Sequence, residues 1–138
     1  MADQPNAAAP TARPLSPHLS IYRWPVTMAS SITHRATGVA LAVGTLFLAW
    51  WLVAAAAGPS AYANFTATAH SPIGLIVMFG FVWSLSFHLL NGIRHLAWDL
   101  GFGFKISTAH ATGITVYILS VLLAVAVFAC GLSSMGLS

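Results

Sequence analysis

Charged side chains are almost absent from this 138-residue chain, which has five Lys and Arg, two Asp and Glu, and 58% hydrophobic residues. None of the charged residues lies between Arg35 and Arg94. Soluble domains carry roughly a quarter charged residues, so this composition excludes an ordinary soluble protein and indicates an integral membrane protein. Five basic residues are also too few for the clustered basic face that nucleic-acid binding needs.

Cysteine is nearly absent as well, and no catalytic pattern is recognisable. The single cysteine, Cys130, excludes an internal disulfide and a cysteine-based metal cluster. It lies among Ala, Val and Phe residues, so we expect a packed thiol. The sequence has no nucleophile–base constellation, no phosphate-binding loop and no acidic pair. We therefore expect no catalytic residue and no independent enzymatic activity.

A targeting segment is not apparent either. Residues 1–12 are polar and rich in Ala and Pro, without the basic region and short apolar core of a secretory signal. They also lack the Arg-rich amphipathic pattern of a mitochondrial transit peptide. This favours a bacterial inner-membrane protein, or a mitochondrial inner-membrane protein that has already been processed.

Three long apolar segments predict three transmembrane helices, at about 26–57, 72–98 and 109–132. Each exceeds the roughly 20 residues that cross a bilayer core. Pro25 and Ser71-Pro72 suit first helical turns, and Gly58-Pro59 suits a helix end. We therefore expect an all-α fold with an N-terminal segment 1–24 and one transmembrane domain 25–135. Residues 58–71 and 101–105 are expected to be loops.

The basic residues are expected to lie on one side of the membrane. Cytoplasmic segments of membrane proteins carry an excess of Lys and Arg. The N-terminus and the second loop are therefore predicted in the cytoplasm (or matrix), and the C-terminus outside. The residues that precede or open the first helix, or flank the second loop, are Arg13, Arg23, Arg35, Arg94 and Lys105.

One ionisable residue, His88, lies deep within the second apolar segment. An unpaired polar ring in hydrocarbon is costly, so His88 predicts a metal or cofactor partner, although a hydrogen-bonded packing role stays open. His95 shares its helix face but lies roughly 10 Å along the axis. Two axial nitrogens on one haem iron lie only about 4 Å apart, so this helix cannot supply both. His34 is expected near the inner interface, too shallow to be the opposite ligand.

A second set of residues recurs at helical spacing on the first helix and shares roughly one face: Trp24, Met28, Ser31, Ile32 and Arg35. A guanidinium and a hydroxyl in an apolar pocket suit a carbonyl ligand such as a quinone, because they donate hydrogen bonds to its oxygens. His34 and Arg35 also suit anionic propionates. The alternative, that Arg35 reaches lipid phosphate and orients the helix, stays open.

The inner end of the second helix carries Trp98, which is typical of an interfacial anchor, and Asp99, which is expected to pair with Arg94, Lys105 or a partner subunit. Three helices with scattered small residues can pack closely, but they can hardly enclose a large site alone. A partner membrane subunit is therefore expected. The rival interpretation, from a different functional class, is a small transporter or channel subunit with a polar path through His88.

Three ordered motifs carry a resemblance to a known family. They are Arg13-Pro14-Leu15-Ser16-Pro17-His18-Leu19 with Ile21-Tyr22, then Ser31-x-x-His34-Arg35-x-Thr37-Gly38, then His88-x-x-Asn91-Gly92-Ile93-Arg94-His95-Leu96-x-Trp98-Asp99. In this combination the chain resembles the cytochrome b membrane-anchor subunits of succinate dehydrogenases, of the alphaproteobacterial and mitochondrial type. The resemblance runs from about residue 13 to the C-terminus.

This resemblance implies a four-subunit enzyme. A flavoprotein oxidises succinate, an iron–sulfur subunit passes the electrons on, and two membrane anchors bind ubiquinone and one haem b. It implies that His88 is a haem ligand, that a histidine of the second anchor is the other, and that Arg35 serves both haem and quinone. The remaining implied residues are His34 and His95 around the haem, Ser31 at the quinone, and Trp24, Met28 and Ile32 as apolar walls. The anchor of a quinol:fumarate reductase, the same machine run backwards, stays an alternative.

Overall fold

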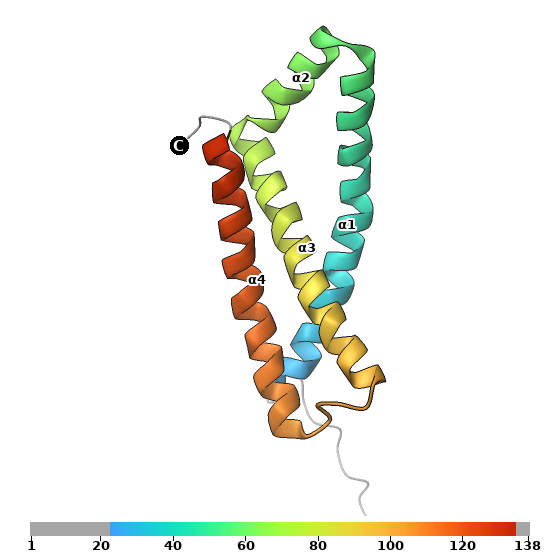
Figure 1. Cartoon of the computed structure of the whole chain (residues 1–138), viewed down its shortest axis with the longest axis vertical. Helices are drawn as coiled ribbons and strands as arrows, with labels where there is room; N and C mark the ends of the chain where they lie inside the picture. Colours follow the sequence, from blue (N-terminus) through green and yellow to red (C-terminus); the bar gives the residue numbers. More distant parts are fainter. Residues whose placement is uncertain (1–22, 135–138) are drawn as a thin grey trace, which may run out of the picture.

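The computed structural model describes residues 23–134 and has an all-α fold (Figure 1). The helices are α1 (Val26–Ala57), α2 (Pro59–Ala69), α3 (Pro72–Asp99) and α4 (Ile106–Ser134). Of these, α1, α3 and α4 are long and apolar enough to cross a membrane. The prediction of an all-α chain with three membrane-spanning helices is confirmed. The expectations for residues 1–22, including Arg13 and His18, lie outside the described residues.

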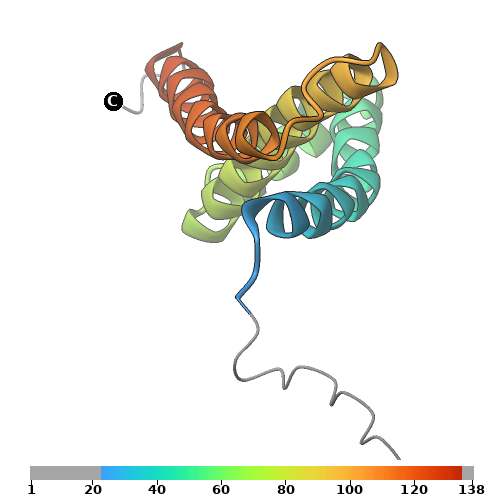
Figure 2. The same ribbon diagram turned by 90° about the horizontal axis from the view of Figure 1, so that it is seen from below.

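The middle helix of the bundle is α3, which contacts both α1 and α4 (Figures 1 and 2). The start of α1, the end of α3 and the start of α4 lie at the same end of the molecule. This arrangement brings Arg23, Arg94 and Lys105 from three separate segments to one end. The antiparallel order therefore agrees with the one-sided placement of charge that the sequence predicts.

The segment between the first two long helices is a helix, so the prediction of a loop over residues 58–71 is wrong. Gly58, with a φ of 109°, makes the turn that most other residues would enter only with strain. Pro59 then occupies the first turn of α2, where its missing N–H costs nothing. Phe65 of α2 is buried against the rings of Phe47 and Trp50 on α1. This packing holds α2 against the C-terminal part of α1.

The other turns follow the predicted signals. Ser71 caps α3 by accepting a hydrogen bond from the Gly74 backbone N–H over 3.1 Å, and Pro72 begins the helix. The second loop closes through Gly101 and Gly103, whose φ angles of 87° and 83° favour glycine. The last helix begins three residues earlier than the predicted 109 and ends two residues after the predicted 132. Both shifts add apolar or small residues to a continuous helix.

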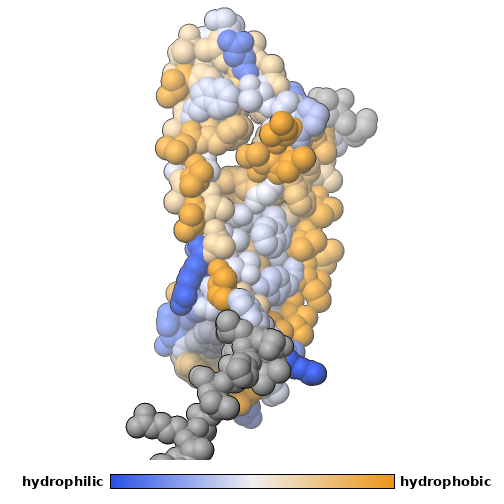
Figure 3. Space-filling view, turned by 180° about the vertical axis from the view of Figure 1, so that it is seen from behind, coloured by the Kyte–Doolittle hydropathy of each residue, from blue (hydrophilic) through white to orange (hydrophobic). Residues whose placement is uncertain are grey.

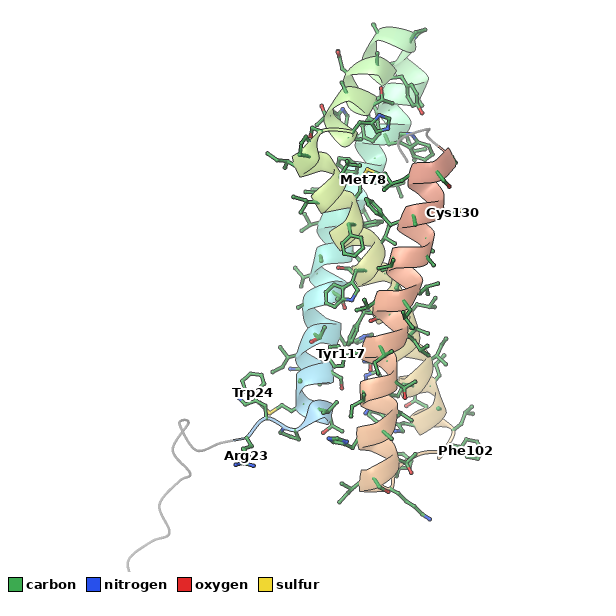
Figure 4. The ribbon with its side chains drawn as sticks, turned by 90° about the vertical axis from the view of Figure 1, so that its left-hand side faces the viewer. Arg23, Trp24, Met78, Phe102, Tyr117 and Cys130 are labelled. Carbon is green, nitrogen blue, oxygen red and sulfur yellow. The ribbon has the colours of Figure 1, made fainter. Side chains whose placement is uncertain are left out.

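Much of the apolar surface points outward, as a membrane or a partner subunit requires (Figure 3). Val39, Val43 and Leu46 of α1 are all more than half exposed. The expectation of a packed Cys130 is wrong for this chain alone, because the thiol is exposed near the C-terminal end of α4 (Figure 4). Val127 and Ala129 are exposed with it, so a local apolar context does not report burial within the chain.

Candidate functional site

Three histidines from two helices meet in the half of the bundle that contains the start of α1 and the end of α3. The ring of His34 on α1 stacks on the ring of His88 on α3, with centroids 3.8 Å apart and planes within 11°. The ring of His95, two turns further along α3, lies 5.2 Å from that of His34. The sequence predicted that His88 and His95 share a face, and the structure places His34 against both.

The position of the His88 ring is set by α1. Its Nδ1 lies 3.2 Å from the main-chain oxygen of His34 and 3.3 Å from Oγ1 of Thr37. A carbonyl oxygen only accepts hydrogen bonds, so the bond to His34 requires that His88 Nδ1 carries the proton. In the neutral ring Nε2 then bears the lone pair. Ligating histidines in metal sites are commonly oriented in this way, through their second ring nitrogen.

A glycine gives the His88 ring its place beside α1. A Cβ built on Gly38 would lie 3.1 Å from Cε1 of His88, which is tighter than ordinary van der Waals contact. Gly38 therefore lets the imidazole approach the α1 backbone closely enough to reach the His34 carbonyl. Gly92, the glycine that the sequence suggested for a close ring approach, has open space beside it.

The ring of His34 lies between those of His88 and His95, 3.8 Å from the first and 5.2 Å from the second. Its predicted depth in the membrane stays a prediction. The stacking still prevents the two rings from flanking one iron. Each Fe–N bond is about 2 Å long and each ring centroid lies behind its nitrogen, so the centroids of two axial ligands must be well over 4 Å apart. The pair cannot coordinate one metal ion in this arrangement.

Some polar atoms of the site have no partner. His34 Nδ1 is buried and makes no hydrogen bond within the described residues, and the same holds for the side-chain amide nitrogen of Asn91. Buried polar groups are almost always satisfied, so an orphaned atom beside His88 indicates a missing partner. Within residues 23–134 no group of three or more His, Cys, Asp or Glu side chains could hold a metal ion. A metal bound at His88 would need ligands from elsewhere.

The residues of the predicted quinone face differ in their exposure. Ser31 is half-buried, whereas Arg35 and Ile32 are exposed on α1. Arg35 makes no hydrogen bond or ion pair with another described residue, so its donors are open to a ligand or a partner. Trp24 precedes α1, is 59% exposed and projects away from the helices (Figure 4). Met28, the remaining member, is half-buried.

Arg94 has a role that the sequence did not indicate. Instead of reaching the membrane surface or pairing with Asp99, its side chain is buried, with 7% exposed, between three helices. It donates to Thr112 Oγ1 at 3.1 Å, to Ser30 Oγ at 3.3 Å, to Asn91 Oδ1 at 3.3 Å and to the Ala109 carbonyl at 2.9 Å. The guanidinium also lies 4.0 Å from the centroid of the Trp98 ring. Arg94 therefore ties α1, α3 and α4 together beside the cluster.

A second polar contact joins α1 to α4. The hydroxyl of Tyr117, which points from α4 towards the neighbouring helices, lies 2.7 Å from Oγ1 of Thr33 (Figure 4). The Tyr117 ring also packs on Phe87 of α3, with centroids 4.9 Å apart. Thr33 directly precedes His34, so this contact fixes the α1 backbone at the cluster.

Comparison with known proteins agrees with this geometry. The family model described as succinate dehydrogenase/fumarate reductase transmembrane subunit matches residues 10–127. The succinate dehydrogenase cytochrome b556 subunit of Paracoccus denitrificans is 45% identical over 113 residues, which cover 82% of this chain and 87% of that protein. The corresponding subunit of Rickettsia felis is 44% identical over 112 residues, 80% and 86% of the two chains. The mitochondrial cytochrome b560 subunit of Bos taurus is 42% identical over 112 residues, 80% of this chain and 66% of that protein. The chain therefore belongs to the succinate dehydrogenase/fumarate reductase transmembrane subunit family, among its cytochrome b subunits.

Proposed function

We propose that this chain is a membrane anchor of succinate dehydrogenase that helps to bind haem b and ubiquinone, and through which electrons from the iron–sulfur subunit reach quinone. The observation that carries the proposal is the orientation of His88. Its Nδ1 is held by the His34 carbonyl, which leaves the Nε2 lone pair for a metal. The names of the relatives, cytochrome b556 and b560 subunits, agree with a haem at such a residue.

The residues around His88 fit a haem. His88 would hold the iron through Nε2, and His34, Arg35 and His95 are the groups that would meet its propionates. His34 Nδ1, which is buried and has no hydrogen-bond partner in residues 23–134, is an atom that such an anionic group would satisfy. A haem supplies one-electron redox chemistry when bound.

The second iron ligand would come, in this proposal, from a second membrane anchor. Within this chain, His95 lies two turns from His88, and the His34 ring is stacked face to face on it. Neither can therefore take the opposite position. The outward-facing apolar side chains of α1 support a partner that completes the helical bundle. The iron–sulfur and flavoprotein subunits complete the enzyme, and this chain has no independent activity.

The quinone site is proposed on the face of α1 that carries Ser31 and Arg35. Arg35 and Ser31 lie one turn apart and donate to the quinone oxygens, while Trp24, Met28 and Ile32 contact the ring. The quinone oxygens gain negative charge as electrons arrive, so positioned donors stabilise the partly reduced molecule more than the oxidised one. The exposure of Arg35 on α1, next to His34 of the histidine cluster, supports a quinone at this position.

The family model covers both succinate dehydrogenases and fumarate reductases, so a quinol:fumarate reductase anchor is the second candidate. The relatives at 42–45% identity, all named succinate dehydrogenase subunits, favour the first. No observation favours the transporter or channel subunit.

Substitutions in α1 test the quinone site. We expect Arg35→Leu or Ser31→Ala to lower quinone reduction while succinate oxidation with an artificial soluble acceptor stays largely intact, because the flavin chemistry lies in another subunit. A hydrogen bond to a charged group contributes about 1.5–3 kcal/mol, so Arg35→Leu should slow quinone reduction roughly 10- to 100-fold. Both rates are measured on the purified complex.

Lys105→Leu and Ser107→Ala are matched controls, because both residues are exposed at the same membrane end but lie outside the proposed site. They should leave both rates unchanged. Equal loss of the two activities in Arg35→Leu, with normal assembly, would show that the quinone site is misplaced.

The proposed location is the bacterial inner membrane, with the N-terminal segment 1–24 in the cytoplasm. It rests on the positions of Arg23, Arg94 and Lys105 at one end of the bundle. A cleavable tag placed before residue 1 is expected to resist protease in intact spheroplasts and to be cut only after lysis. Cleavage in intact spheroplasts would reverse the topology.

A further inference from the structure

We propose that Thr37 is a positioning residue for His88. Thr37 holds Nδ1 of His88, the ring nitrogen that does not bind the iron, and thereby adjusts the electron donation of the imidazole to the haem iron. This inference rests on the function proposed above. Thr37 is 3% exposed and lies one turn after His34 on the side of α1 that faces α3. Its Oγ1 is 3.3 Å from Nδ1 of His88. The family motifs in the sequence contain Thr37, but its spacing alone gave it no role.

The direction of this contact follows from where the hydroxyl proton goes. Thr37 Oγ1 lies 2.9 Å from the Thr33 carbonyl and 3.0 Å from the His34 carbonyl, and it donates to these. With its proton committed to the helix backbone, Oγ1 offers His88 a lone pair. His88 Nδ1–H therefore donates to two acceptors, Thr37 Oγ1 and the His34 carbonyl. The opposite tautomer would face the Nδ1 lone pair with two oxygens that have only lone pairs to offer.

The ring is also clamped sterically, so the two acceptors act on a fixed nitrogen. Gly38 lies against one edge of the imidazole, where a Cβ on this residue would come within 3.1 Å of Cε1. The His34 ring covers one face at 3.8 Å. Thr37, Gly38 and the His34 backbone belong to one turn and a half of α1. A single short segment therefore sets the tautomer, the tilt and the hydrogen bonding of the ligand.

The consequence is electronic as well as geometric. A stronger hydrogen bond from Nδ1–H makes Nε2 a better electron donor, and a better donor stabilises the ferric over the ferrous iron. Removing the Thr37 oxygen should therefore shift the haem midpoint potential to more positive values. Removing the hydrogen-bond partner of a metal-binding histidine typically lowers metal affinity roughly 10- to 100-fold. The His34 carbonyl still accepts a hydrogen bond from His88 in the variant, so we expect haem affinity to fall by roughly 10-fold.

The test uses the whole purified complex and the variant Thr37→Val, which keeps the shape and removes the hydroxyl. We expect a more positive midpoint potential in a spectroscopic redox titration and faster transfer of haem to an excess of a haem-accepting protein. Thr37→Ser keeps the oxygen and should restore both values. Thr45→Val is the matched control, because Thr45 also donates to a carbonyl of α1, that of Ala42, but is exposed and away from His88.

An unchanged potential and unchanged haem transfer in Thr37→Val would overturn the inference, as would a Thr37→Ser variant that behaves like Thr37→Val. If Thr37→Val does not assemble, the comparison of Thr37→Ser with Thr37→Ala carries the same test. Failure of the proposed function gives a different result from failure of this inference. If the proposed function is wrong, the wild-type complex itself contains no haem, whereas failure of the inference shows only in the Thr37 variants.

Discussion

The variant His88→Leu is expected to alter the haem spectrum of the purified complex or to lose haem. Leucine fills a similar volume beside Gly38 and stays compatible with the apolar interior, but it has no nitrogen to offer. A haem b between two histidines needs both of their nitrogens, and His88 offers the lone pair of Nε2 when its Nδ1–H donates to the His34 carbonyl. The measurement is the reduced-minus-oxidised absorption spectrum, scaled to the protein concentration.

Neighbouring histidines define the controls. The variant His95→Leu should leave both axial nitrogens in place, and His110→Leu removes an exposed histidine of α4 that lies outside the cluster. The double variant His34→Leu/His88→Leu is needed too, because the His34 ring stacks on His88 and is the nearest replacement for a missing imidazole. A wild-type spectrum in the double variant would disprove the assignment. A structure with both axial ligands from this chain would overturn the sharing of the haem between two subunits.

The three long helices could be predicted from the sequence because lipid imposes a simple rule. A spanning segment excludes charge over a fixed length, and Pro72 and the loop glycines mark where each helix begins or ends. The short helix α2 could not be predicted in this way. Its 11 residues carry no membrane-length pattern, and its packing depends on the contact of Phe65 with Phe47 and Trp50, two residues that belong to another helix.

The histidine site could be predicted in its members but not in its arrangement. The spacing of His88 and His95 follows from the helical period. The stacking of His34 on His88 depends on how α1 crosses α3, and counting residues from the helix ends does not give that register. The same register places Thr37 and Gly38 against the ring. The helix contains many small residues, so the sequence alone does not distinguish these two from the others. Their contacts with His88 become apparent only when α3 is placed beside α1.

Arg94 shows the same limit for a charged residue. A long side chain near a helix end can extend outward to the membrane surface or inward between helices. The choice depends on which acceptors come near it, and these belong to Ser30 of α1 and to Ala109 and Thr112 of α4. Only the tertiary arrangement brings these acceptors together. The position of Arg94 near the loop therefore indicated the membrane topology but not the buried hydrogen bonds of its guanidinium.

Arg94→Leu is therefore expected to destabilise the complex. Two effects oppose each other, because the substitution removes a buried cation that has no acidic partner among the described residues, and it also removes the bonds that join three helices. Polar contacts within membranes contribute about 0.6 kcal/mol on average and about 1.7 kcal/mol at most. Arg94 makes four hydrogen bonds and the contact with Trp98. The stability lost with these contacts should therefore exceed the stability gained by removing the buried cation by about 2–4 kcal/mol. The apparent melting temperature of the solubilised complex should fall by roughly 5 °C or more.

The variant Arg94→Lys separates the network from the charge. An ammonium group keeps the positive charge but is a single point, and it cannot reach Ser30, Thr112 and the Ala109 carbonyl at once. The cation would stay buried with fewer partners, which is costly, so lysine should stabilise the complex no better than leucine. Arg23→Leu, at an exposed arginine of the same membrane end, should leave the melting temperature unchanged. Full recovery by Arg94→Lys would show that charge alone matters at this position, and the bridging role of the guanidinium would then be wrong.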